Sequence, residues 1–239
     1  MLVLLENGDF ALSITRLEFD PETETLSPII EFLGVEFALG MLVVGFLTLS
    51  GIAHTLLATA LYGRYRRYLR MSKNPYRWYE YSLSASLMLV AIAVISGISD
   101  LGTLLAIFVL TALMNLFGLL MERYNDLSGG SPRRVLDWKP FIFGCLAGVV
   151  PWIIIAITIV ATYVEYPGEF PNFVIGATVV TFVFFNSFAV NMYLQYRKLG
   201  RWRDYLFGER VYILLSLFAK TVLAWWVYFG IQGSPIVTG

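Results

Sequence analysis

One lysine, Lys220, lies in the middle of the last long apolar stretch of the chain, residues 211–230. About 20 apolar residues are enough for an α-helix to cross the hydrocarbon core of a bilayer. A charge at the centre of such a helix costs roughly 2.5 to 3.5 kcal/mol on insertion scales, so it usually marks a functional site. A buried lysine can pair with a carboxylate, line a water-filled transport path, or form a Schiff base with an aldehyde.

Several side chains on the same predicted helix could complete a site around this amine. Ser216 lies one helical turn earlier and on the same face, so its hydroxyl and the Lys220 amine can share a small polar site. Aromatic residues nearby could wall a long apolar ligand, although aromatic residues in membrane helices also serve plain packing; they are Tyr212, Phe218, Trp225 and Trp226.

Two other ionisable residues lie in or beside apolar stretches. His54 is the only ionisable residue within residues 37–61, and Glu80 stands near the start of residues 78–98. A protonated amine in hydrocarbon requires a counter-charge, and Glu80 is the carboxylate best placed to supply it. Each residue alone is also compatible with a purely structural role, as a packing histidine or an interfacial glutamate.

The depth of Glu80 sets a condition on this pairing. Hydropathy places Glu80 near one membrane edge, whereas Lys220 lies deep in its helix. The two can meet only if the second helix extends back to Pro75 and its neighbours cover Arg77.

Amides and hydroxyls in the apolar stretches allow two interpretations. Buried amides can line a pocket or pin helices together; they are Asn115, Asn186 and Asn191. The serines of the second stretch permit close helix approach; they are Ser82, Ser84 and Ser86. We include Asn115 and Ser84 among the candidate pocket residues.

The composition indicates an all-α integral membrane protein. The chain of 239 residues is 58% hydrophobic and 14% charged, with a mean hydropathy of +0.70. Six apolar stretches are long enough to span a bilayer as helices, and they cover residues 37–61, 78–98, 101–121, 141–164, 173–196 and 211–230. We expect the bundle to occupy residues 32–230, followed by a tail at 231–239.

Residues 1–31 differ from the rest of the chain. The stretch FALSITRLEF alternates apolar and polar residues between turn signals at Asn7-Gly8 and Asp20-Pro21. This alternation predicts a short strand or hairpin outside the membrane.

The basic residues predict the orientation. Of the 17 Lys and Arg residues, 15 fall in the three alternate connections that follow the first, third and fifth apolar stretches. Basic loops face the cytoplasm, so we expect a multi-pass protein of the cell membrane with the N-terminal segment and the C-terminus outside.

Other classes of function find little support. A formal net charge of zero gives no basic excess for nucleic-acid binding. One cysteine and one histidine, Cys145 and His54, cannot build a disulfide, a thiolate cluster or a multi-histidine metal site. We predict neither a metal centre nor an enzyme.

Four phrases of the sequence resemble the heliorhodopsins, relatives of the retinal-binding microbial rhodopsins. They are NPYRWYEYSLSAS at 74–86, TALMNLFGLLMERYN at 111–125, FFNSFAVNMYLQY at 184–196 and WRDYLFGERVYILLSLFAK at 202–220. The phrases are long, in order, and spread over four segments. The resemblance extends over about residues 33–230.

The resemblance implies a role for each candidate residue. Lys220 carries all-trans retinal as a covalent Schiff base, Glu80 is the counterion, and Ser216 tunes the pair where pumps have an aspartate. His54 belongs to a polar cluster on the cytoplasmic side. The remaining retinal-binding candidates are Tyr81, Ser84, Asn115 and Trp225.

The resemblance also implies a light-sensing photoreceptor with a slow photocycle, no net ion transport, a homodimeric state and an unidentified cytoplasmic signalling partner. Two alternatives stay open: a light-driven proton or ion pump, and a retinal-free transporter or structural subunit in which Lys220 only pairs with Glu80. Ser216 in place of a second carboxylate disfavours the pump.

The family has seven membrane helices, whereas six apolar stretches are present here. The stretch at 37–61, with SGIAHTLLAT, is similar to the second helix of the family. We therefore expect the six helices to correspond to helices two to seven, with MLVLL as the last turn of the first and a strand-forming loop after it.

Overall fold

A computed structural model describes residues 4–5, 9–21, 25–125, 127, 136–167 and 170–232. Six helices in these ranges are long and apolar enough to cross a membrane. They are α1 (Leu39–Ala58), α3 (Pro75–Ile95), α4 (Leu101–Tyr124), α5 (Lys139–Glu165), α6 (Asn172–Tyr196) and α7 (Tyr205–Gln232). The predicted rhodopsin-like membrane bundle is confirmed.

Two of these helices begin three or more residues earlier than hydropathy predicted. α3 begins at Pro75 because Asn74 caps it: the Asn74 side chain accepts a hydrogen bond from the Arg77 backbone amide at 3.3 Å, and proline suits the first helical position. α7 begins at Tyr205, six residues before the apolar stretch. Polar side chains in both extra turns are buried against each other, which hydropathy cannot detect.

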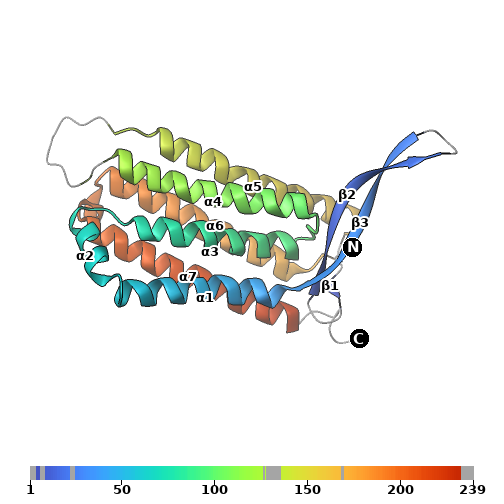
Figure 1. The fold of residues 1–239 in the computed structure, drawn as a ribbon, viewed down its shortest axis with the longest axis horizontal. Helices are drawn as coiled ribbons and strands as arrows, with labels where there is room; N and C mark the ends of the chain where they lie inside the picture. Colours follow the sequence, from blue (N-terminus) through green and yellow to red (C-terminus); the bar gives the residue numbers. More distant parts are fainter. Residues whose placement is uncertain are drawn as a thin grey trace.

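Two short helices were not predicted. α2 (Tyr62–Arg70) follows α1, and the 3₁₀ helix η1 (Gly200–Arg203) precedes α7. Both are rich in arginine and lie at the end of the bundle that also carries the connection between α4 and α5 (Figure 1). We call this end the basic end, and the opposite one the hairpin end.

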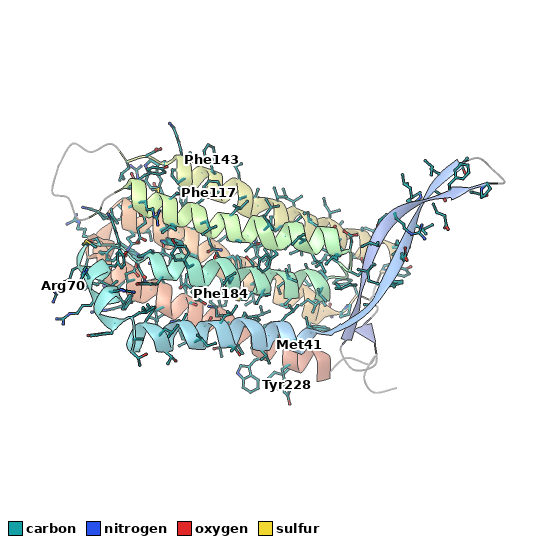
Figure 2. The ribbon with its side chains drawn as sticks, viewed as in Figure 1. Met41, Arg70, Phe117, Phe143, Phe184 and Tyr228 are labelled. Carbon is teal, nitrogen blue, oxygen red and sulfur yellow. The ribbon has the colours of Figure 1, made fainter. Side chains whose placement is uncertain are left out.

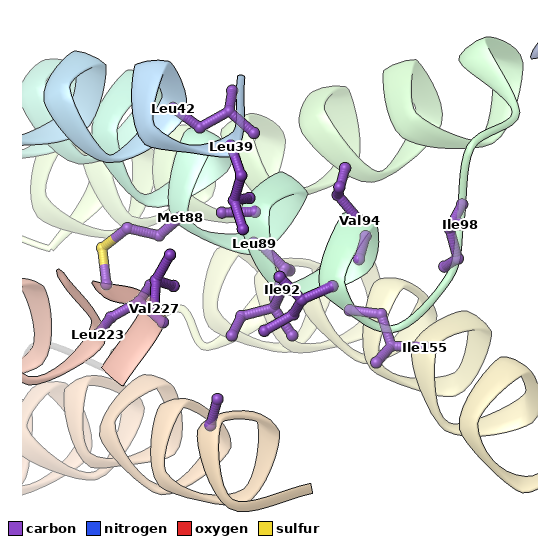
Figure 3. Close-up of a cluster of buried hydrophobic side chains, with 14 of the residues drawn as sticks. Leu39, Leu42, Met88, Leu89, Ile92, Val94, Ile98, Ile155, Leu223 and Val227 are labelled. Carbon is purple, nitrogen blue, oxygen red and sulfur yellow. The ribbon is translucent and has the colours of Figure 1, made fainter. Parts of the chain in front are cut away.

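Helix α3 forms the centre of the bundle, between α1 and α4 (Figure 1). It is the most deeply buried of the six membrane-spanning helices, because 67% of its most apolar 18-residue stretch is buried inside the bundle. Figure 3 shows its side chains in the main hydrophobic core, where Leu89 and Ile92 pack with Ile155 of α5 and Leu223 of α7. A rigid α3 therefore positions every residue that it carries into the interior.

The outer faces of the helices are apolar and uncovered. Met41 of α1, Phe143 of α5 and Tyr228 of α7 all project outward in Figure 2 and are about half exposed or more. An apolar exterior around a bundle is the surface expected of a protein whose solvent is lipid.

The predicted N-terminal hairpin is present. β2 (Asp9–Asp20) and β3 (Thr25–Ala38) pair antiparallel, and β1 (Leu4–Leu5) adds to the free edge of β2. β3 runs on to Ala38, beyond the boundary expected at residue 31, so α1 begins only at Leu39. The prediction that MLVLL ends a helix is wrong for Leu4–Leu5, because the backbone of these two residues pairs antiparallel with Asp9 and Phe10 of β2.

The hairpin contacts the bundle at the turn between α3 and α4. The Ser13 backbone amide donates to the Ser99 carbonyl oxygen at 3.0 Å, and the two hydroxyl oxygens lie 3.0 Å apart. Beyond this point the hairpin extends past the end of the helices (Figure 1). The middle strand, β2, is thus held at the tight turn between α3 and α4.

Asp100 caps the start of α4, and its removal should destabilise the fold. Its Oδ2 accepts from the Thr103 amide at 2.7 Å and the Thr103 hydroxyl at 2.8 Å, which lowers the pKa of the Asp100 carboxyl. We expect Asp100→Ala to cost about 0.5–2 kcal/mol of unfolding free energy at neutral pH.

The pH dependence of this effect follows from the lowered pKa. The contribution is fully present above the unfolded value of about 3.9 and disappears as the pH falls through the lower folded value. Thermal unfolding of the variant against Glu18→Ala, an exposed carboxylate of the hairpin, measures it at neutral and acid pH. A loss as large in strong acid as at neutral pH would contradict the capping role.

Candidate functional site: a buried lysine between two cavities

Lys220 and Glu80 form a buried ion pair between α7 and α3. The Lys220 Nζ lies 2.6 Å from the Glu80 Oε1, and each side chain is 7% exposed. The sequence allowed this pair only if the second helix extended to Pro75 and Arg77 was covered. Both conditions are met, because α3 begins at Pro75 and Arg77 is only 6% exposed. The extra first turn of α3 brings Glu80 deep enough to reach the amine.

Ser50 of α1 contacts both members of this ion pair, and the sequence did not reveal it. Lys220 Nζ donates to Ser50 Oγ at 2.5 Å, and Ser50 Oγ lies 2.6 Å from Glu80 Oε1 and 2.9 Å from the Phe46 carbonyl oxygen. Its hydroxyl can donate to only one of these two acceptors at a time. The only available signal was its position one turn before His54, and serine is too common in membrane helices for that to identify it.

His54 lies beside the ion pair without joining it. Its side chain is exposed, and its Nδ1 is 2.8 Å from the Ser50 carbonyl oxygen. It shares with Glu80 the lining of a cavity of about 290 Å³, which we call the polar cavity. The polar cavity runs from Glu80 to Glu209 at the basic end, so His54 faces a route that leads away from Lys220.

A second, smaller cavity of about 40 Å³ is lined by Lys220 itself, and we call it the lysine cavity. Four of the predicted pocket residues line it with Lys220, namely Tyr81, Ser84, Asn115 and Ser216. Its apolar walls are Ala85, Met88, Met114, Phe185, Phe188 and Ala219. Methionine side chains adapt readily, so Met88 and Met114 can swing aside to admit a longer ligand.

The polar groups of the lysine cavity differ in their hydrogen bonding. The Tyr81 hydroxyl donates to the Tyr212 carbonyl oxygen at 3.0 Å, and its ring centroid lies 5.3 Å from the Lys220 Nζ. Asn115 Nδ2 donates to a carbonyl of its own helix at 2.9 Å. The fully buried Ser84 hydroxyl has no partner among the described residues. An unsatisfied buried hydroxyl costs free energy, which a ligand in the cavity could recover.

The prediction that Trp225 walls the pocket is wrong. Trp225 is 56% exposed and stacks on Phe229, with ring centroids 5.5 Å apart. Five residues after Lys220 is a rotation of about 140° around an α-helix, so the ring turns outward. Phe218 is likewise 56% exposed, while Trp226 is partly buried and donates to the Phe173 carbonyl oxygen at 2.8 Å.

The other two amides take the structural role. Asn191 of α6 donates to the Gly208 carbonyl oxygen at 3.2 Å and accepts from the Trp202 indole at 2.6 Å, so it joins α6 to the start of α7. Asn186 donates only within its own helix, to the Phe182 carbonyl oxygen at 2.8 Å.

The fold and the site together define a class of protein. The centre of a membrane helix bundle holds a lysine with a carboxylate partner, at the end of a cavity walled by methionine, phenylalanine and alanine. This donor set fits an apolar aldehyde held on the lysine amine within the membrane. The chain is therefore of the type that holds a chromophore or other carbonyl ligand in a rhodopsin-like bundle.

The comparison with protein families agrees with this class. The heliorhodopsin family model matches residues 1–232, so the chain belongs to the heliorhodopsin family. It is a multi-pass membrane protein of the retinal-binding rhodopsin type. None of the curated proteins matches the chain.

Proposed function

We propose that this protein is a light-sensing photoreceptor that binds all-trans retinal covalently, as a Schiff base on Lys220. The observation that carries the proposal is the buried contact of 2.6 Å between Glu80 and Lys220, whose side chain lines the lysine cavity. A lysine that only stabilised the fold would need the carboxylate but not the adjoining apolar cavity.

Retinal supplies visible absorption and a light-driven isomerisation when it is bound. Glu80 balances the positive charge at the Lys220 nitrogen, and Ser50 holds the carboxylate in place through its own hydrogen bond. When the Lys220 nitrogen loses its proton, Glu80 is the nearest base. The polar cavity, with His54 on its wall, then offers a water-accessible path for that proton toward the basic end.

The remaining pocket residues position and tune the ligand in this proposal. Ser216 faces the same cavity as Lys220 and places a neutral hydroxyl where pumps have an aspartate. Tyr81, Ser84 and Asn115 supply an aromatic ring, a free hydroxyl and an amide to the wall of this cavity. With Glu80 as the single carboxylate at Lys220, we expect the proton to stay within the protein and not to be carried across the membrane.

We further propose a slow photocycle, no net ion transport, and signalling through the basic end to an unidentified cytoplasmic partner. The arginines of α2 and η1 support a cytoplasmic position for this end under the positive-inside rule, and in this proposal the hairpin and the C-terminus lie outside. Within α4, no carboxylate lies between Gly102 and Met121, so a second proton-carrying acid near Lys220 is lacking on that helix.

Illumination of sealed vesicles tests the transport part of the proposal. With retinal bound, we expect a transient proton signal that returns to its starting value in continuous light. An uncoupler should leave the signal unchanged, because no gradient is built. A sustained pH change that an uncoupler abolishes would show that the protein is a light-driven pump.

The hairpin favours a homodimer. Paired residues share one face of a sheet, so the register puts Leu17, Phe19, Leu26 and Ile30 on the same side, each more than half exposed. The opposite side, which we call the polar face, carries the Arg16–Glu31 ion pair at 2.5 Å and Glu18, beside the half-buried Ile14 and Ile29. An uncovered apolar face of this kind marks an interaction surface, and a second copy of the chain is the partner that we propose.

Substitution of this apolar face should dissociate the dimer. We expect Phe19→Ser with Ile30→Ser to convert the protein from dimer to monomer, because the change removes two exposed apolar side chains from the contact. The matched control is Glu18→Ser, on the polar face of the same strand. The measurement is the protein mass by light scattering in detergent or nanodiscs. A wild-type monomer, or a double variant that stays dimeric, would contradict the proposal.

A further inference from the structure

A second buried charge cluster lies at the basic end of the bundle. The polar cavity connects it with Glu80, the partner of Lys220. The centre of the cluster is the guanidinium of Arg77 on α3, which faces Glu122 of α4 and Glu209 of α7. The three side chains are 5%, 3% and 4% exposed. One cation therefore serves two buried carboxylates, each from a different helix.

Glu122 accepts hydrogen bonds from several neighbours. Its Oε1 accepts from the Asn74 backbone amide at 2.7 Å and lies 3.1 Å from the Tyr205 hydroxyl. Its Oε2 accepts from the Trp78 indole at 3.0 Å. Arg77 is farther away, with 3.7 Å between its Nη2 and the Glu122 Oε1. The guanidinium is therefore not the dominant partner of Glu122.

Glu209 takes the guanidinium instead. The Arg77 Nη1 donates to the Glu209 Oε1, and the Asn74 Nδ2 donates to the Glu209 Oε2 at 2.9 Å. The Tyr205 hydroxyl, which donates to Glu122, belongs to a residue one helical turn before Glu209 on α7. Residues four apart share one face of a helix, so Tyr205 joins Glu122 from the face of α7 that also carries Glu209.

The charges of this cluster do not balance. The other ionisable groups that face it are neutral tyrosines, namely Tyr65 of α2, Tyr196 of α6, and Tyr205 and Tyr212 of α7. Burial, and then the charge of Glu209, raise the pKa of Tyr65, so it stays protonated. Across the polar cavity, α1 contributes His54. With Arg77 as the one cation among the described residues of the cluster, two ionised carboxylates would leave a buried net charge of −1.

An uncompensated buried charge costs several kcal/mol, and such a group takes up a proton instead. Two carboxyl groups that share one site hold such a proton jointly. We propose that Glu122 and Glu209 hold one proton between them, with the Tyr205 hydroxyl bonded to Glu122, and that this pair exchanges protons with Glu80 through the polar cavity. The exchange rests on the photoreceptor function proposed above, whereas the shared proton does not.

The polar cavity supplies the physical connection. Glu80 and Glu209 both line it, and Arg77 and Asn74 lie on its wall between them. Its volume of about 290 Å³ holds several water molecules. A proton that leaves Lys220 for Glu80 can thus reach the carboxyl pair without crossing the apolar core.

Infrared spectroscopy of the protein in the dark tests the shared proton. We expect one carbonyl stretch of a protonated carboxylic acid that shifts in D₂O. Either E122Q or E209Q alone should remove it completely, because the remaining carboxylate is then balanced by Arg77. The control is E165Q, at the exposed end of α5, which should leave the band unchanged. Y205F should shift the band while both carboxyl groups are retained, and this variant serves if a glutamine variant fails to fold.

Two results would overturn the shared proton. One is a wild-type spectrum without the band, which would mean that both groups are ionised and that a bound cation balances them. The other is a band that persists at full intensity in E209Q, which would mean that Glu122 is protonated independently.

Flash-induced infrared difference spectra test the exchange. If the pair exchanges protons with Glu80, the same band should change during the photocycle and recover with it. A band that is present in the dark but constant after the flash would overturn the exchange and leave the shared proton intact. Absence of any visible pigment would instead refute the photoreceptor function, and the dark spectrum would still report on the carboxyl pair.

Discussion

Lys220→Ala should abolish the pigment completely. The purified wild-type chain, incubated with all-trans retinal, is expected to develop a red-shifted visible band, and the variant is expected to show only the absorption of free retinal. The reason is that Lys220 is the amine that faces the lysine cavity, with Glu80 beside it to stabilise the positive charge. The measurement is a visible absorption spectrum, with Lys139→Ala, an exposed lysine at the start of α5, as the control.

A second variant, Lys220→Arg, separates loss of the Schiff base from loss of the ion pair with Glu80. Lys220→Ala leaves Glu80 buried without its cation, so it also destabilises the fold. Lys220→Arg keeps a positive charge against Glu80, but a guanidinium does not form an imine, so this variant should fold and remain colourless. A retinal band in either variant would assign the Schiff base to another amine. The absence of a band in wild type would return Lys220 to a structural ion pair.

The sequence was sufficient to predict the membrane helices and the central pair. Lys220 stood out because charge is rare and costly in hydrocarbon, and charge balance then selected Glu80 as its partner. The same reasoning could not find Ser50, because a hydroxyl carries no such cost and only its contacts with Lys220 and Glu80 reveal it. A charge in the middle of an apolar stretch could be recognised from the sequence, whereas a hydroxyl that acts only through its hydrogen bonds could not.

The positions of two residues, Trp225 and Arg77, were predicted wrongly for the same physical reason. Trp225 was assigned to the pocket by its type and by its closeness in sequence to Lys220, but helical rotation turns it outward. Arg77 was counted as a loop cation, yet Glu122 and Glu209 from other helices bury it. Both errors concern which face of a helix meets which neighbour. Hydropathy summed over a window does not contain that information.

The Lys220–Glu80 pair should also show strong energetic coupling in the protein without retinal. Removal of one partner from a buried ion pair costs about 3–5 kcal/mol, because the other charge stays buried and unpaired. We therefore expect Glu80→Gln and Lys220→Met each to lose about that much unfolding free energy. The double variant buries neither charge, so its loss should be clearly smaller than the sum of the two single losses.

Unfolding of the four proteins in mixed detergent micelles completes this cycle. Ser50 stays in place in all of them, so its hydroxyl can still bond to the Phe46 carbonyl oxygen when Glu80 is replaced. The control is Glu165→Gln combined with Lys220→Met, two sites without a mutual ion pair, whose effects should add. If Glu80→Gln and Lys220→Met were also additive, the two side chains would not be coupled, and Glu80 could not serve as the counter-charge of the lysine. Strong coupling would instead show that the protein already holds its charged pair before the ligand binds, so that the site is preorganised for a cationic linkage at Lys220.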